Sequence, residues 1–295
     1  MADTVDTAET ADTADTAAEV APVVPLRHAV EVASAVPDVV EHPLPIDLGA
    51  DLHVHTDLGR GTASAVGVVD AAQAAGLHTV GITDQVSAAT EWLPDYVEMV
   101  RAFSYREGIT VRCGVETAVL ATAGRLDLPA EVPDLDHVVV TAVVVPTATG
   151  PAEVEQVRAA LERGEVTGEQ VVDDLVAAMV AATGTAPARV VLGRPFSLLP
   201  QLGLPDDLVT DDHLLAVAEA CETHGASVEV DETWRAPSAR VALALAEAGV
   251  ELVAGSDATA PRGVGAWRYL AALTGTTAAA DDEQDAPAEL AVVAS

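Results

Sequence analysis

Short apolar runs rich in Val and Ile alternate with longer Ala-rich stretches between residues 51 and 257. The runs are almost wholly apolar, which is typical of strands that are covered on both faces of a parallel sheet. The stretches between them are long enough for helices, and helices connect the parallel strands of α/β folds. The expected strands are 51–56, 79–84, 110–118, 137–145, 189–195, 227–232 and 251–257.

Helices are expected between these strands, near 64–75, 88–105, 152–183, 211–223, 237–248 and 263–273. Gly76, Gly225 and Gly249 follow three of the stretches, at the place where the end of a helix favours glycine. Seven strands alternating with helices over roughly 225 residues are typical of one closed β/α barrel. An open, doubly wound sheet is the alternative, but no GxGxxG or GxxxxGK[ST] pattern follows the first strand.

The two ends of the chain differ in composition from its body. Residues 1–22 are a degenerate repeat of Ala, Asp and Thr without apolar periodicity, and residues 276–295 return to Ala and acidic residues. Both are expected to be disordered tails, because such segments bury too little apolar surface to fold. The barrel domain is expected to span residues 23–275.

The formal net charge is −33, and the acidic excess extends through the body of the chain. Such a surface repels nucleic acid and anionic membranes, so neither is an expected partner. No apolar run reaches the roughly 18 residues of a membrane helix, and the N-terminus lacks the pattern of a secretory signal. Cys113 and Cys221 are far apart in the sequence and form no CxxC pattern, so we expect both to be reduced thiols. We therefore expect a cytoplasmic protein.

Two histidines, His53 and His55, stand two residues apart in the first expected strand, DLHVHT. Side chains at positions i and i+2 of a strand point to the same face, so the two imidazoles project together. Such a pair is half of a metal site. The alternative is a structural role, which an isolated HxH pair in a strand has more often.

Further polar residues stand at the C-terminal ends of the strands, where β/α barrels carry their active sites. They are Asp84, Glu116, Arg194, Glu229, Asp231, Glu232 and Asp257. A buried carboxylate is costly unless it is paired, and a cation would pair it. The two imidazoles with Glu116 and Asp257 form an N₂O₂ set that suits Zn²⁺, Mn²⁺ or Fe²⁺. Alternatively, Asp84 and Asp257 cap helices, and Glu116 pairs with an arginine.

The polar motifs, in their order and spacing, resemble those of the PHP (polymerase and histidinol phosphatase) superfamily. They are DLHVHT, GLHTVGITD, GVET, LDHVVVTAV, VLGRP, VEVDETWRAPSAR and GSDATAPRGVG, and they cover about residues 49–272. Each motif alone is weak, but the ordered set is specific. The resemblance implies a distorted (β/α)7 barrel with two or three metal ions at its strand ends. It also implies hydrolysis of phosphoesters by a metal-bound hydroxide.

The sequence departs from the family pattern where the family carries five further histidines. Those places read Arg60-Gly61, Gln85, Val143, Arg194 and Thr259. The residues that resemble the shell of the first metal all remain, namely His53, His55, Glu116 and Asp257. We therefore expect a mononuclear site with one divalent ion of Zn, Mn or Fe, and neither a second nor a third metal.

Three arginines, Arg60, Arg194 and Arg235, are expected to bind the anionic group, for example a phosphate, of a small-molecule substrate. Arg235 follows Trp234, and the two match a W-R pair in the family; the alternative, which is the more common one for such an arginine, is that Arg235 only packs over its loop. Arg194 stands where the family has a metal-binding imidazole, so it could bind an oxyanion bidentately and assist catalysis. The alternative, with equal weight, is that it fills a vacated metal pocket as an ion pair with Glu116 or an aspartate.

Two other polar residues have simpler expectations. Asp84 is either a catalytic general base that acts on metal-activated water or only a helix cap. His137 begins a strand, away from the expected active face, and is expected to be structural.

These residues support three hypotheses of function. The first is a metal-dependent hydrolase that resembles PHP phosphoesterases and activates water with one metal ion. The second is a catalytically inactive PHP-like binding protein, because so many of the family's ligands are replaced. The third is a barrel repurposed for other chemistry, as a lyase, cyclase or amide hydrolase in a specialised pathway.

Overall fold

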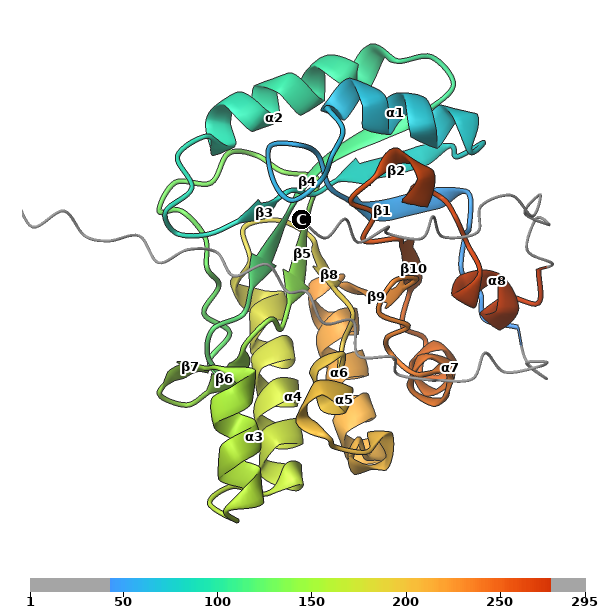
Figure 1. Ribbon diagram of the computed structural model, residues 1–295. Coiled ribbons are helices and arrows are strands. Elements are labelled where there is room, and N and C mark those ends of the chain that lie inside the picture. Colours follow the sequence, from blue (N-terminus) through green and yellow to red (C-terminus); the bar gives the residue numbers. More distant parts are fainter. Residues whose placement is uncertain (1–42, 277–295) are drawn as a thin grey trace, which may run out of the picture. The chain divides into compact units, whose positions relative to one another are not determined.

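The structure of the protein is a computed structural model that describes residues 43–276 (Figure 1). All of these residues belong to one unit of the chain, residues 34–295. The tails expected at 1–22 and 276–295 fall outside the described range, apart from Thr276. Within residues 43–276, no helix combines the length and the apolarity that a membrane span requires.

Seven parallel strands form the main sheet, in the order β1-β2-β4-β5-β8-β9-β10. All seven expected strands are therefore found, and each pairs with the next in chain order. Their bounds are β1 Ala50–Val54, β2 Thr79–Ile82, β4 Thr110–Ala118, β5 His137–Thr141, β8 Val190–Leu192, β9 Ser227–Asp231 and β10 Leu252–Gly255. A short strand, β3 (Gln85–Val86), adds to β4.

The first and last strands meet and bring the sheet close to a closed barrel. Val54 forms a parallel bridge with Ala258, just beyond β10, and the backbone N–H of His55 donates to the carbonyl of Ala258 at 3.0 Å. The backbone N–H of Ser256 donates to Oδ1 of Asp51 at 3.0 Å. The expected α/β barrel is confirmed, and the open, doubly wound alternative is not observed.

Helices cover the outside of this sheet (Figure 1). Their bounds are α1 Ala65–Ala74, α2 Leu93–Arg101, α3 Val154–Glu162, α4 Gly168–Thr185, α5 Leu198–Leu202, α6 Asp211–His224, α7 Ala239–Glu247 and α8 Tyr269–Leu273. Gly76, Gly225 and Gly249 have positive φ angles at the ends of α1, α6 and α7, as expected. Glycine is favoured there because it adopts this conformation without strain.

Several elements differ from the expected ones because turn residues interrupt apolar runs. The stretch 152–183 divides into α3 and α4 around Gly164, which has a φ of 68°. The strand expected to reach residue 145 ends at Thr141, and a separate hairpin of β6 (Val145–Thr147) and β7 (Gly150–Ala152) follows. Within the stretch 263–273 the α-helix is confined to α8, after a 3-10 turn at Pro261–Gly263, because Gly265 also has a positive φ.

Aliphatic side chains fill the space between the sheet and the helices. The fully buried ones on strands include Val80, Ile82, Val115, Val138, Val140, Val228 and Val230. The barrel interior at the C-terminal strand ends is polar instead, with His53, His55, Glu116, Asp231 and Asp257 all buried. Since burying unpaired charge is costly, these groups must compensate one another or share a cation.

Candidate metal centre

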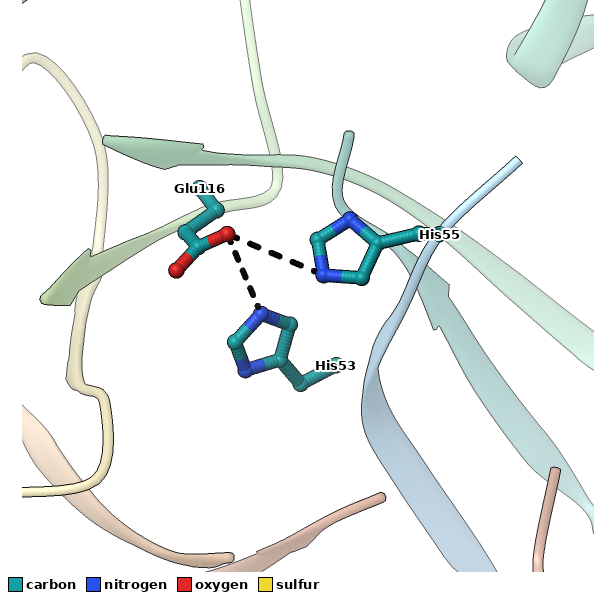
Figure 2. Close-up of side chains that lie close together, drawn as sticks. All are labelled: His53, His55 and Glu116. Carbon is teal, nitrogen blue, oxygen red and sulfur yellow. Dashed lines mark ion pairs between the residues drawn. The ribbon is translucent and has the colours of Figure 1, made fainter. Parts of the chain in front are cut away.

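His53 and His55 point from β1 and its C-terminal end into the barrel, as the HxH spacing predicts (Figure 2). Both side chains are completely buried. Their Nε2 atoms each lie 3.7 Å from the same oxygen, Oε2 of Glu116 on β4. The rings are 5.0 Å apart and inclined at 64°, so both nitrogens face one point without stacking.

Asp257 adds a fourth side chain to this group from the end of β10. Its Oδ1 lies 2.9 Å from Nε2 of His55 and 3.6 Å from Nε2 of His53. Ligands that share one tetrahedral ion at 2.0–2.2 Å lie about 3.4 Å from one another. The distances between the histidine nitrogens and the carboxylate oxygens in the cluster, 2.9, 3.6 and 3.7 Å, lie around this value. The structure thus brings together all four residues that the sequence singled out as metal ligands.

A second carboxylate, Glu229 on β9, orients His53. Its Oε1 lies 2.8 Å from Nδ1 of His53, which favours a proton on Nδ1 and directs Nε2 toward Glu116 and Asp257. Among the described residues, this buried Nε2 has no hydrogen-bond partner. A histidine held by a carboxylate with its other nitrogen free is the usual arrangement of a metal ligand. The donor set therefore fits a divalent cation.

Gly255 makes room for Glu229. A Cβ atom on Gly255 would overlap the carboxylate of Glu229, and the adjacent Gly193 also faces it. Sequence reasoning noted Glu229 as a polar strand end but gave it no role. The signal was present, because Glu229 and Asp231 are two residues apart and share a face of the strand, as His53 and His55 do.

Arg194 binds the far side of the two carboxylates. Its Nη2 donates to Oε1 of Glu116 at 2.9 Å, and its Nη1 donates to Oδ2 of Asp257 at 3.1 Å. Its backbone N–H donates to Oε2 of Glu229 at 2.9 Å, and its side chain is only 4% exposed. The structure therefore shows Arg194 in ion pairs with Glu116 and Asp257, and its expected role in oxyanion binding and catalysis stays a prediction.

Two further side chains support these carboxylates, and sequence reasoning did not assign them. The indole Nε1 of Trp234 donates to Oδ2 of Asp257 at 2.7 Å, and the Arg194 guanidinium lies over the Trp234 ring, 4.9 Å from its centre. The hydroxyl of Thr141 donates to Oε1 of Glu116 at 3.0 Å. Threonine at the end of an apolar strand carries little sequence signal, so Thr141 could not have been found that way.

Arg60 reaches the cluster from the loop after β1. Its Nη2 lies 2.9 Å from Nε2 of His55 and 3.4 Å from Oε2 of Glu116, and it also contacts Oδ1 of Asp257. The Arg60 side chain is 35% exposed. The structure places the terminal nitrogen of Arg60 among the metal-ligand candidates, and its expected binding of substrate stays a prediction.

The charges of the cluster shift one another's protonation. Burial alone would raise the pKa of Glu116, but Arg194, His53 and Arg60 hold it well below its usual range. Burial is likewise outweighed at Asp257, whose pKa is lowered by His53, His55 and the two arginines. The pKa of His53 is raised well above its ordinary value because Glu229 and Asp257 outweigh burial. Burial lowers the pKa of His55.

Asp84 is buried and faces Thr56 rather than a helix. Its Oδ1 accepts the backbone N–H of Thr56 at 2.7 Å, and its Oδ2 accepts the Thr56 hydroxyl. The same Oδ1 lies 3.9 Å from Nδ1 of His55, and burial raises the pKa of Asp84. The strand β3 follows directly, so Asp84 does not cap a helix. Its expected role as a general base stays a prediction.

A pocket of about 360 Å³ opens beside Asp257 and is lined in part by Arg60, Trp234 and Arg262. Arg235 does not belong to its lining and is an exposed residue with a φ of 51° in the turn after β9. The contact of Arg235 with a substrate therefore stays a prediction.

A second group of potential ligands overlaps the first. His53, Glu229 and Asp231 have ligand atoms close enough to share an ion. Burial raises the pKa of Asp231 well above its ordinary value, and the negative charge of Glu229 adds to this effect. His53 Nδ1 is already bound to Glu229, so this group does not offer a separate set of free donors.

Comparison with known proteins supports the fold and the resemblance of the sequence motifs. Residues 51–188 match the family model of the PHP domain. In structure, the chain is similar to hisK, a candidate histidinol phosphatase from Listeria monocytogenes, with a TM-score of 0.56. The two share 13% sequence identity, and the match covers 73% of this chain and 97% of that one; at this identity the likeness shows the fold.

No curated protein matches the chain. The family match covers the His53–His55 motif and Glu116, and the barrel that continues beyond it supplies Asp257. The resemblance to the PHP superfamily is thus confirmed over residues 51–188.

Proposed function

We propose that this protein is a PHP-type hydrolase of phosphoesters that uses one divalent metal ion. His53, His55, Glu116 and Asp257 would hold the ion. The observation that carries the proposal is the buried Nε2 of His53, which lacks a partner among the described residues and faces Oε2 of Glu116 and Oδ1 of Asp257. A divalent ion there supplies Lewis acidity and lowers the pKa of a water molecule.

The remaining residues of the cluster prepare this position. Glu229 holds the His53 ring, so that Nε2 keeps its direction. Arg194 binds Oε1 of Glu116 and Oδ2 of Asp257 and leaves the other oxygen of each carboxylate facing the histidines. Since the guanidinium already neutralises the far side, it supports our proposal of a mononuclear site.

The substrate group would enter through the pocket beside Asp257. Arg60 and Arg262 line it and are the positive charges available to an anionic group there. Their local field would have to overcome the repulsion of an acidic protein with a net charge of −33. A small phosphoester fits a pocket of about 360 Å³ better than a polymeric substrate does.

The test is metal analysis followed by a substrate panel. The full chain, purified without chelator, would be analysed for Zn, Mn and Fe and then assayed with added metal on phosphoesters, carboxylic esters and amides. His53→Ala removes a ligand, and His78→Ala, at an exposed histidine bound to Asp47, is the matched control. We expect phosphoester turnover that needs metal, is lost in His53→Ala and persists in His78→Ala. Turnover that persists in His53→Ala would contradict the proposal.

The second candidate is a metal-free binding protein. It is favoured by Arg60 and Arg194, which together supply a cationic partner to both carboxylate oxygens of Glu116 and of Asp257. This candidate predicts that the purified protein binds no added metal and hydrolyses nothing in the panel. Hydrolysis of amides or carboxylic esters alone would instead favour a repurposed barrel.

A further inference from the structure

The terminal nitrogen of Arg60 lies where a metal ion would lie. Nη2 contacts His55 Nε2, Glu116 Oε2 and Asp257 Oδ1, and the same three atoms are metal-ligand candidates. An ion bonded to them at about 2.0–2.2 Å would fall within the van der Waals envelope of that nitrogen. The guanidinium and a metal ion therefore cannot occupy the position together.

We propose that Arg60 is a displaceable internal cation that competes with the divalent metal ion for this position. The proposal rests on the proposed function, because it concerns the same ligands. With the guanidinium inserted, the carboxylates are neutralised without metal. When a metal ion enters, the guanidinium must withdraw into the adjoining pocket, whose lining already includes Arg60.

The surroundings of Arg60 allow this withdrawal. Its side chain is 35% exposed, whereas that of Arg194 is 4% exposed. Both terminal nitrogens of Arg194 are bound to carboxylates, and its backbone N–H is bound to Glu229. The contacts of Arg60 with the cluster are all made by a single terminal nitrogen. Arg194 is thus a fixed cation and Arg60 a removable one.

The backbone that carries Arg60 is held in place, so the movement is one of the side chain. The N–H groups of Gly59 and Gly61 both donate to the carbonyl of Thr56, at 3.1 and 2.8 Å. A Cβ on Gly61 would overlap the carbonyl of His55, which shows how closely the loop packs on β1. Rotation about the side-chain bonds of Arg60 is enough to open the position.

Competition of this kind lowers the apparent metal affinity. Only the fraction of molecules with the guanidinium withdrawn can bind the ion, and the apparent dissociation constant rises by the inverse of that fraction. Removal of the guanidinium should therefore tighten metal binding, although it also removes a residue from the pocket. A residue that merely lined the pocket would leave metal affinity unchanged.

The experiment is a calorimetric titration in which Zn²⁺ is added to the full chain after chelator has removed any bound metal. The variants are Arg60→Ala and Arg60→Gln; the second keeps an amide in the position if the first fails to fold. Arg262→Ala is the matched control, because it removes the same charge from the same pocket without touching the ligands. The double variant His53→Ala with Arg60→Gln tests whether the gain occurs at this site.

We expect both Arg60 variants to bind Zn²⁺ at least about tenfold more tightly than the unchanged protein. Arg262→Ala should keep the original affinity, and the double variant should lose the gain. Equal affinity with and without Arg60 would overturn the competition while leaving a metal-dependent function intact. A gain shared by Arg262→Ala would also overturn it, and no binding in any variant would overturn both proposals.

Discussion

Arg194 donates a hydrogen bond to Oε1 of Glu116 at 2.9 Å, while Oε2 of the same carboxylate faces the two histidines. The two carboxylate oxygens of Asp257 also have different partners, since Oδ2 binds Arg194 and Oδ1 is directed at His55. The two carboxylates thus separate a fixed guanidinium from a second cation position. This arrangement explains how the acidic residues at the strand ends of this barrel can stay buried.

Replacing Arg194 should destabilise the fold strongly. Arg194→Met would leave Glu116 and Asp257 buried without their main partner, and loss of one partner of a buried ion pair typically costs about 3–5 kcal/mol. Arg189→Met is the matched control, since Arg189 pairs with Glu251 at the surface with 44% of its side chain exposed. That change should cost about 1 kcal/mol or less. Urea denaturation measures both, and similar losses in the two variants would argue against a buried pair.

Adding one methyl group at Gly255 should disturb the metal centre through Glu229. The Cβ of Gly255→Ala would overlap the Glu229 carboxylate and force it away from His53. We expect a loss of about 1–3 kcal/mol in unfolding free energy and metal binding weakened by about 10–100-fold. Gly67→Ala, within α1, is the control and should be neutral or slightly stabilising. Unchanged metal affinity in Gly255→Ala would show that Glu229 does not orient His53.

The indole of Trp234 should stabilise the fold through its hydrogen bond to a charged group. Trp234→Phe keeps a ring beside Arg194 but loses the bond to Asp257, which should cost about 1.5–3 kcal/mol. Trp267→Phe loses a similar bond, 2.9 Å long, to the neutral carbonyl of Leu48, and should cost about 0.5–1.5 kcal/mol. The two are compared by chemical denaturation, and the larger loss in Trp267→Phe would refute the charge-assisted bond.

His137 should make stability depend on pH. Burial lowers the pKa of its imidazole to about 4, and its Nε2 lies 3.1 Å from the carbonyl of Leu52. Between about pH 4 and 6.5 the unfolded chain binds the proton that the folded protein excludes, so stability falls as the pH falls through this window. His137→Gln keeps a donor to Leu52 and cannot titrate.

The unfolding free energy of the two proteins would be measured at pH 7.5 and pH 5. We expect the unchanged protein to lose about 2 kcal/mol more than His137→Gln over this interval. An equal loss in both would mean that His137 is already protonated in the folded protein or does not contribute. This result also bears on its expected structural role, because a structural histidine should affect stability and leave metal binding unchanged.

The barrel could be predicted from the sequence because its strands are continuous apolar runs separated by helices. Each of the seven expected strands pairs in chain order, and glycine at positions such as Gly225 ends the helices as expected. Short elements could not be predicted. The hairpin of β6 and β7 starts at the last valine of a Val-rich run and contains Pro146, Gly150 and Pro151, residue types that usually argue against a strand.

The metal-ligand candidates could be predicted because they stand at strand ends, whose positions the barrel fixes. His53, His55, Glu116 and Asp257 converge for this reason. The role of Arg60 could not be predicted, because its long side chain extends from a loop. Sequence gives the charge of such a residue, while packing and the competing carboxylates determine where its terminal atoms lie.

The most direct test of a single metal centre is anomalous scattering from crystals of the protein grown with excess Zn²⁺ or Mn²⁺. We expect one peak bounded by His53, His55, Glu116 and Asp257, with Arg194 still bound to the two carboxylates and the Arg60 guanidinium withdrawn. A position without a peak at saturating metal, or metal bound only elsewhere in the barrel, would contradict this expectation.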